Sequence, residues 1–225
     1  MSNAYQMCTN LTGSPVCGEK VIHMNSAYSY CINLSGSPAC GPNVTSMNNA
    51  YSGCINLSGS PACGEKVIDM SCAYWNCYSL TGSPVCGNNV TNMGGAYYNC
   101  TNLTGSPVCG PKVTSMTASS IISGRFVSVG AYQNCYNLSG NSYFYSPNVA
   151  NVQNCFYGRN NSTALNIYVI NGSKTHTTVL TNNASSLVGA EITWTDAGTH
   201  VYNTQYNIYI YPVADIAAAR AANGD

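Results

Sequence analysis

Charged side chains are scarce in this 225-residue chain, in which Asp, Glu, Lys and Arg make up 6% of residues and the formal net charge is zero. Globular proteins typically carry about 25% charged residues. A nucleic-acid-binding protein needs a basic surface that neutralises phosphates, so this composition argues against nucleic-acid binding. Solubility must come from Asn, Ser, Thr and Gly, and the neutral surface offers little charge repulsion against close packing with neighbouring subunits.

Long apolar runs are absent too. No stretch of about 18 apolar residues is present, so we expect no insertion into a membrane. The first residues lack the basic segment and apolar run of a secretory signal peptide. If the protein works in a virion, outside the cell or at a cell surface, we expect it to leave by another route or its signal to lie outside this chain.

Catalytic signatures are also missing. The three histidines, His23, His176 and His200, lie in different segments. No phosphate-binding or dinucleotide-binding loop is present. The chain has many serines, and no sequence pattern singles out one of them as the nucleophile of a Ser-His-Asp triad. We therefore expect no enzymatic activity and no cofactor.

The chain does contain a regular sequence repeat. Residues 1–116 hold five regular blocks of 23 residues, each with a Tyr, a Leu, a Gly-Ser-Pro phrase and two Cys in the same places. The first Cys of each block is Cys8, Cys31, Cys54, Cys77 or Cys100, and the Tyr is Tyr5, Tyr28, Tyr51, Tyr74 or Tyr97. A fixed period of roughly 20–50 residues predicts a repeat solenoid, in which each coil buries its apolar side against its neighbours.

Each block has apolar columns of Met, Ala, Tyr, Cys, Leu, Val or Ala, a second Cys, and Val. The first four recur at i, i+3, i+4 and i+7, which predicts a short helix. An extended segment follows, as over 34–40, and Gly41 ends it with a turn. Gly-Ser-Pro interrupts that segment, because Pro has no N–H to give to a ladder. We expect parallel pairing of about three residues per coil, shorter than an ordinary strand.

Thirteen cysteines raise the question of metal binding and of disulfides. Their spacing forms a lattice rather than the converging short Cys-Cys pairs of a zinc site, so no metal site is expected. Bridges between adjacent coils, about 5 Å apart, are within reach. A repeated column cannot pair without ambiguity, however, and free Cys is among the most buried residue types. We expect most thiols to be reduced packing residues, with Cys72 as the partner in any bridge that forms.

An Asn column also repeats, at Asn10, Asn33, Asn56 and Asn102. Each Asn begins an Asn-Leu-Ser/Thr phrase, which could be a glycosylation signal. The favoured interpretation is a ladder of amides that satisfies backbone groups from coil to coil.

The second half departs from the period. Residues 117–130 are an insertion expected to pack as a hairpin or flap, and 131–164 hold two degenerate repeats. Alternating apolar residues predict a β-rich C-terminal cap over 165–213, with a helix over 177–187. Residues 214–225 are an Ala-rich tail or linker.

The frame Ala-Tyr-x-x-Cys-x-x-Leu resembles the BspA-type bacterial leucine-rich repeat, whose core is Ala-Phe-x-x-Cys-x-x-Leu at a similar period. Here Tyr replaces Phe, and Gly-Ser-Pro departs from the apolar strand of that family. The phrase at 88–93 is similar to a related surface-protein repeat. The resemblance covers 1–116 and, weakly, 131–170. It implies a leucine-rich-repeat-like solenoid of short strands and short helices, as found in bacterial surface proteins and in phage tail or baseplate proteins.

Two surfaces are candidate contact sites. Aromatic rings outside the Tyr column suit glycan stacking and protein contacts, and the candidates are Trp75, Tyr98, Tyr143, Tyr145, Tyr202 and Tyr211. No coil precedes the first one, so we also expect an apolar assembly face there, made of Met1, Ala4, Tyr5 and Leu11.

These observations predict a non-enzymatic structural or host-recognition module of a phage tail or other virion appendage. Its expected partners are other subunits of the same or a larger assembly, and a protein or glycan of the host surface. The alternatives are a repeat domain of a bacterial cell-surface adhesin and a self-assembling extracellular filament subunit.

Overall fold

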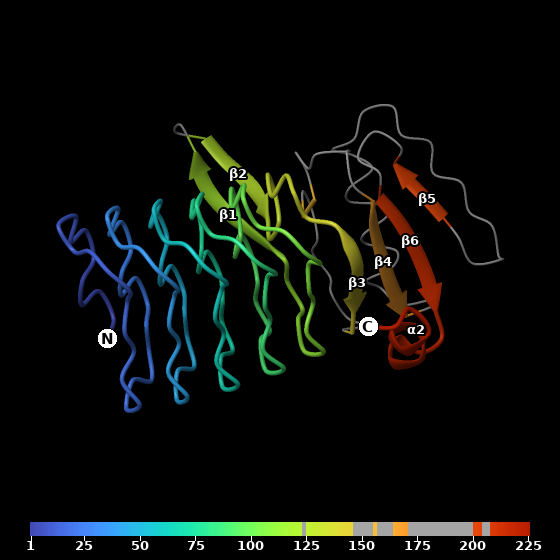
Figure 1. Cartoon of the computed structure of the whole chain (residues 1–225), viewed down its shortest axis with the longest axis horizontal. Helices are drawn as coiled ribbons and strands as arrows, with labels where there is room; N and C mark the ends of the chain where they lie inside the picture. The colour runs from blue at the N-terminus through green and yellow to red at the C-terminus, as the bar shows by residue number, and fades with distance from the viewer. Residues whose placement is uncertain (123–124, 146–154, 157–163, 171–199, 204–207) are drawn as a thin grey trace.

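The computed structural model describes residues 1–122, 125–145, 155–156, 164–170, 200–203 and 208–225. For 121–122, 125–127, 200–203, 208, 210 and 212 it describes the backbone. Successive 23-residue repeats lie side by side as narrow loops, followed by a sheet (Figure 1). Within the described residues, no helix is long and apolar enough to cross a membrane.

The repeats are joined by alternating backbone hydrogen bonds. The N–H groups of Ser26 and Tyr28 donate to carbonyls of the next repeat at 2.9 and 2.8 Å. The N–H groups between them, such as that of Ala27, donate to the carbonyl three residues back in the same repeat. Over residues 26–31, every second N–H therefore binds within its repeat and the others bind across to the next, which satisfies the buried backbone of this segment.

The predicted short helix is wrong, because this segment forms consecutive turns. The third and seventh residues of the block have positive φ, as at Asn49 (54°) and Gly53 (76°). A left-handed residue cannot continue a right-handed helix, and Asn and Gly adopt that conformation at least cost. Consecutive turns also return the chain to the same side every three or four residues, so they reproduce the apolar spacing of a helix.

The predicted interruption of the extended segment is confirmed. Residues 1–116 contain no regular strand, and the repeats are linked by isolated parallel bridges such as Gly13↔Leu34. A column of such bridges runs on the returning limb, through His23, Ser46, Asp69, Asn92 and Ser115. Pairing is thus one residue wide, narrower than the three residues expected.

Most predicted core columns are buried. From the second repeat on, Met, Ala, Tyr, the first Cys, Leu and Val are at most 2% exposed. The Val or Ala column is not part of this core, since its members from the second repeat on, Ala39, Ala62, Val85 and Val108, are only partly buried. The proline before this column points inward instead and is buried, as at Pro15. The second Cys column is partly buried from Cys17 to Cys86.

The hydrogen bonds of the Tyr column explain why these repeats use Tyr, although Phe would fill the same space. Tyr74 donates its OH to the carbonyl of Ala62 at 2.6 Å and accepts from the Ala62 N–H at 3.0 Å. Ala62 follows the proline of the preceding repeat, where no strand partner is present. Tyr51 and Tyr97 do the same for Ala39 and Val85. The hydroxyl therefore supplies both hydrogen bonds that a ladder would otherwise give.

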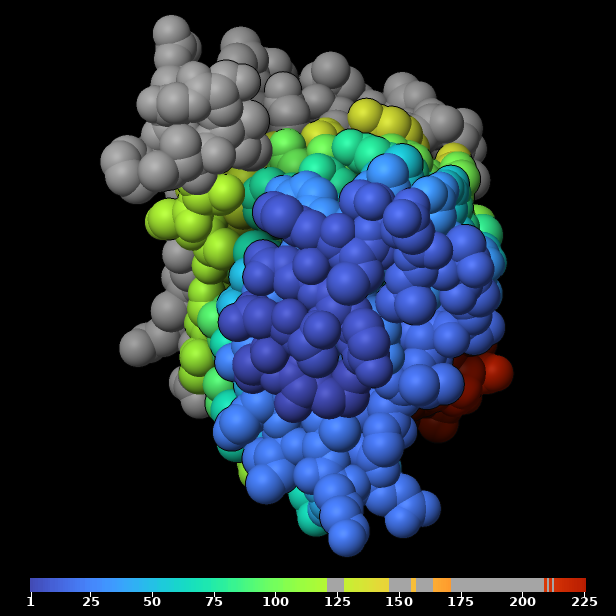
Figure 2. Space-filling model, turned by 90° about the vertical axis from the view of Figure 1, so that its left-hand side faces the viewer, coloured from blue at the N-terminus to red at the C-terminus, as the bar shows by residue number. Residues whose placement is uncertain are grey.

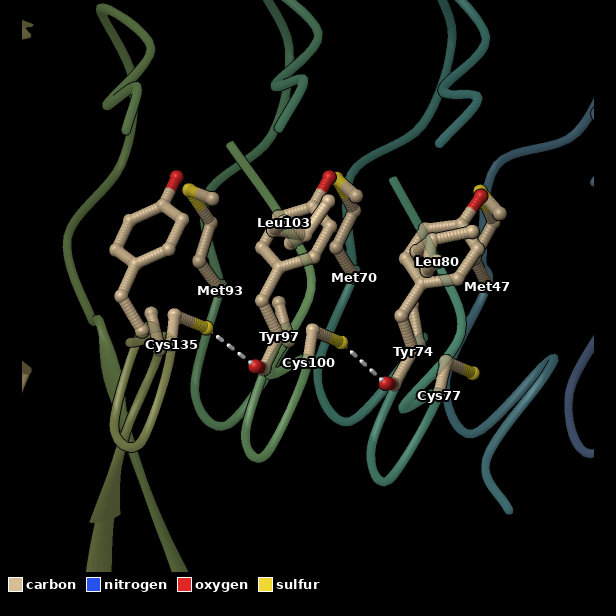
Figure 3. Packing of buried hydrophobic residues seen from close by; sticks show 14 of the residues in the cluster. Met47, Met70, Tyr74, Cys77, Leu80, Met93, Tyr97, Cys100, Leu103 and Cys135 are labelled. Carbon is tan, nitrogen blue, oxygen red and sulfur yellow. Dashed lines mark hydrogen bonds between the residues drawn. The ribbon is translucent and has the colours of Figure 1, made fainter. Parts of the chain in front are cut away.

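The aromatic rings and thiols form parallel ladders (Figure 3). The Tyr74 ring stacks on Tyr51 and Tyr97 with centroids 5.6 and 5.5 Å apart. The Cys100 thiol donates to the Tyr74 carbonyl at 3.0 Å, and other thiols of this column make the same contact. No disulfide joins the thirteen cysteines in the structure. Burial raises the pKa of the Cys54 thiol to about 12, which keeps it protonated.

The favoured interpretation of the Asn column is confirmed at two of its members. Asn33 and Asn56 donate their side-chain amides to the carbonyls of Thr9 and Ile32 in the preceding repeat, at 2.8 and 2.9 Å.

The insertion forms an antiparallel hairpin of β1 (Thr117–Ile122) and β2 (Arg125–Gly130). The hairpin leaves the stack intact, because the Ala131 N–H donates to the Met116 carbonyl at 2.7 Å. The sixth repeat then continues the ladder, and the Tyr97 N–H donates to the Ala131 carbonyl at 2.8 Å.

A mixed sheet follows the repeats, in the order β3-β4-β6-β5. β3 (Gly140–Phe144), β4 (Leu165–Ile170) and β6 (Ile208–Val213) are parallel, and β5 (His200–Asn203) is antiparallel to β6. A bridge between Cys109 and Phe144 ties β3 to the fifth repeat. The sheet thus carries the parallel stacking of the repeats onward.

The chain ends in α2 (Ile216–Ala222), which packs near β3 and β4. The Asp215 side chain caps it by accepting from the N–H groups of Ala217 and Ala218. These residues, predicted to be a tail or linker, therefore include a docked helix. The helix predicted over 177–187 lies outside the described residues.

Candidate functional site

Four aromatic side chains gather on the outer surface of the fourth to sixth repeats. We call this cluster the aromatic face: Trp75, Tyr78, Tyr98 and Tyr136. The Trp75 and Tyr98 rings stack with centroids 4.1 Å apart. Tyr78 and Tyr136 are 40% and 42% exposed. Each of the four directly follows a buried Tyr or Cys of the repeat columns in the sequence.

Glycines allow rings of this surface to lie against the next repeat. A Cβ added at Gly95 would meet the Trp75 ring at 3.1 Å, and Gly95 has a φ of 62°. A similar contact occurs outside this face, where a Cβ at Gly53 would lie 2.7 Å from the Tyr30 ring. A side chain at either position would push the ring away, so Gly is required for the close approach.

Phenol and amide groups lie close to these rings. Burial raises the pKa of Tyr98, as do the nearby phenols of Tyr78 and Tyr136, while a hydrogen bond with Asn99 opposes the shift. An amide row runs alongside, in which Asn99 donates to Asn76 and Asn134 donates to Asn99, at 2.8 and 2.7 Å. Rings and amides suit a partner that offers flat apolar surface and hydroxyl or amide groups.

The structure brings two of the predicted binding residues together, since Trp75 and Tyr98 are half-buried and stacked. The expected exposure of Tyr143 is wrong. It is 8% exposed, because its ring stacks on Tyr168 in β4 and its hydroxyl bonds Asp225. Tyr145 is 37% exposed, as predicted.

Tyr211 is partly buried and stacks on Tyr168 at 4.9 Å. Tyr202 lies in β5, and its side chain is outside the described residues. Tyr78 and Tyr136 were missed by sequence reasoning. Both directly follow a Cys of the first column, at a position held by Ile55 in the third repeat, which is also exposed. That shared position is the signal that could have identified them.

The predicted assembly face is uncovered in the structure, and the first repeat fills the end of the molecule seen in Figure 2. Tyr5 is 41% exposed, whereas its counterpart Tyr28 in the second repeat is 2% exposed. Ala4 is exposed, and Met1 and Leu11 are partly buried against the core.

The part of the chain that the structure describes holds no group of three or more His, Cys, Asp or Glu side chains that could bind a metal ion. Comparisons with protein-family models, with curated proteins and with solved structures find no match for this chain.

Proposed function

We propose that the chain is a non-enzymatic recognition module built on a solenoid of leucine-rich-repeat-like coils, and that it binds a host-surface protein or glycan as part of a phage tail or other virion appendage. The observation that carries the binding role is the aromatic face. Rigid rings lose little conformational entropy on binding, which suits them to contact surfaces.

The solenoid is supported by the hydrogen-bond ladder between successive repeats. Each repeat gives its N–H groups to the next one in the same register, as Ser26 does to Asn48 and Asn49 does to Ser71. The resemblance to BspA-type repeats supports the placement in a virion or at a bacterial surface. A cell-surface adhesin repeat domain would use the same face.

The test is binding of the labelled full chain to arrays of bacterial-surface glycans and to whole bacterial cells. We expect the double variant Tyr78→Ser with Tyr136→Ser to lose binding. Tyr30→Ser is the matched control, because Tyr30 is 48% exposed but lies in the second repeat, outside the aromatic face. Equal binding by both variants would contradict the assignment. Fractionation with virions or with cell envelopes would then separate the two locations.

The uncovered first repeat favours a second candidate, assembly into a filament or a larger particle. No described residue donates a hydrogen bond to the carbonyls of Ser2, Ala4 and Gln6, whereas the equivalent carbonyls of the second repeat accept bonds from the first. A preceding coil or a neighbouring subunit would satisfy them. Addition of a polar capping coil before Met1 is expected to abolish self-association in light scattering. A chain that is already monomeric at high concentration would exclude this role.

A further inference from the structure

A pocket of about 300 Å³ lies where the Gly-Ser-Pro phrases of the fourth and fifth repeats meet β3 and the C-terminal residues. Its lining includes the buried Pro84 and Pro107 together with the polar side chains of Asn141, Tyr145, Arg220 and Asp225. Small-molecule sites span roughly 300–1,000 Å³. This pocket is at the lower end of that range, so it suits a molecule of one or two small rings and is too small for a dinucleotide.

The carboxylate of Asp225 is held in place by its neighbours. Its Oδ2 accepts from the Tyr143 hydroxyl at 2.6 Å and from the Asn141 amide at 2.9 Å. These bonds, that from Tyr143 above all, lower the pKa of Asp225 and keep it ionised at neutral pH. No described residue bonds its Oδ1, so one acceptor oxygen of a positioned carboxylate remains for a ligand.

The hydrogen-bond donors of Arg220 and the ring of Tyr145 also line the pocket, together with the Asp225 carboxylate. The Arg220 Nη1 donates to the Tyr145 hydroxyl at 3.4 Å, a long bond that leaves most of the five guanidinium N–H groups unused by the described residues. The Tyr145 ring is 37% exposed. The pocket therefore combines a donor-only group, an acceptor-only group and an aromatic ring.

This geometry points to a neutral sugar as the ligand of the pocket. A sugar ring has an apolar face that suits the exposed Tyr145 ring, and its hydroxyls both donate and accept. Two adjacent hydroxyls can give a hydrogen to Asp225 and accept one from Arg220. A zwitterion such as an amino acid fits less well, because both charged groups are exposed to water, where ion pairing contributes little.

The sugar site is separate from the aromatic face and does not rest on the function proposed for it. Saturation-transfer NMR on the full chain tests it, with a mixture of the methyl glycosides of glucose, galactose, mannose and N-acetylglucosamine, and with L-alanine as the zwitterionic probe. At least one glycoside is expected to give a signal, and calorimetry then supplies its affinity.

Asp225→Asn and Tyr145→Ala are each expected to weaken that affinity about tenfold or more, as loss of a hydrogen bond to a charged group does. Tyr78→Ala, on the aromatic face, is the control and is expected to leave it unchanged. The inference is overturned if no glycoside binds, if L-alanine binds in their place, or if Tyr145→Ala binds as well as the unaltered chain.

Discussion

The regular repeats and the β3 segment solve the same backbone problem in two ways. In the repeats, proline removes the ladder, and the Tyr hydroxyl bonds both backbone groups of the residue that follows, as Tyr132 does for Val108. In the sixth repeat the proline phrase gives way to β3, and Tyr143, the counterpart of Val108, pairs with Tyr168 of β4. The column residue that stacks on Tyr132 there is Phe156. The hydroxyl is thus present where strand pairing is missing and absent where strand pairing occurs.

Alkaline pH is expected to have the largest effect, because it acts on all the buried thiols and phenols of the repeats together. Burial raises the pKa of Cys54 and of Cys63 to about 12, and it raises the pKa of Tyr74 well above the usual value. These groups are neutral when protonated, so the folded chain keeps its protons to higher pH than the unfolded chain. Their stabilising contribution is complete below the ordinary thiol pKa of about 8.5 and is lost as pH rises through the folded values.

Urea unfolding followed by circular dichroism from about pH 7 to about pH 11 measures this loss. The unfolding midpoint is expected to fall steadily once the pH passes the ordinary thiol pKa. A flat profile over the whole range would mean that the thiols and phenols are accessible to water in the folded chain.

Truncation of a core column should come next. Leu57 is 0% exposed, so Leu57→Ala is expected to lower the free energy of unfolding by about 2–5 kcal/mol, measured by denaturant titration. Leu11→Ala in the first repeat is the matched variant. Leu11 is only partly buried, so its truncation should cost clearly less. Equal losses would show that the first repeat is covered in solution.

Removal of the Tyr74 hydroxyl tests whether this group replaces strand pairing in the repeats. Tyr74→Phe leaves the N–H and carbonyl of Ala62 without their partner and is expected to cost about 1–3 kcal/mol. Tyr5→Phe is the control, because the Tyr5 ring is 41% exposed. It should cost under about 0.5 kcal/mol, as surface changes do. If both variants were equally stable, the hydroxyl would have no structural role.

A surface hydrogen bond should matter little. The Lys66 Nζ donates to the Asn43 side chain at 2.6 Å, but both groups are exposed. Lys66→Ala is expected to change the free energy of unfolding by under about 0.5 kcal/mol. A larger loss would mean that the Lys66–Asn43 hydrogen bond supports the stack.

Reductant is expected to have no effect on stability. No disulfide joins the cysteines, so unfolding curves with and without a phosphine reductant should coincide. Thiol titration in denaturant, on protein purified without reductant, should find most of the thirteen thiols. Fewer than about half would favour bridged columns over packing.

The core columns could be read from the sequence because the 23-residue period aligns identical side chains, and stacking then buries them. The turn structure was missed because an i, i+3, i+4, i+7 spacing is common to a helix and to consecutive turns. Asn49, Gly53, Gly95 and Asn99 carry the distinguishing signal, since they occupy left-handed positions.

The Trp75–Tyr98 stack also follows from the period, because the two residues are 23 positions apart. The pocket could not be predicted. Pro107, Tyr145 and Arg220 converge there only after a hairpin has been inserted and the chain has returned through the sheet.

Amide hydrogen exchange at the residue after proline tests the central claim most directly. In the unaltered chain, the Ala39, Ala62 and Val85 amides should be protected, because each donates to a Tyr hydroxyl. In Tyr74→Phe, the Ala62 amide alone should lose protection relative to the other two. An Ala62 amide that stays as protected as Ala39 and Val85 in this variant would contradict the claim that Tyr replaces the missing strand.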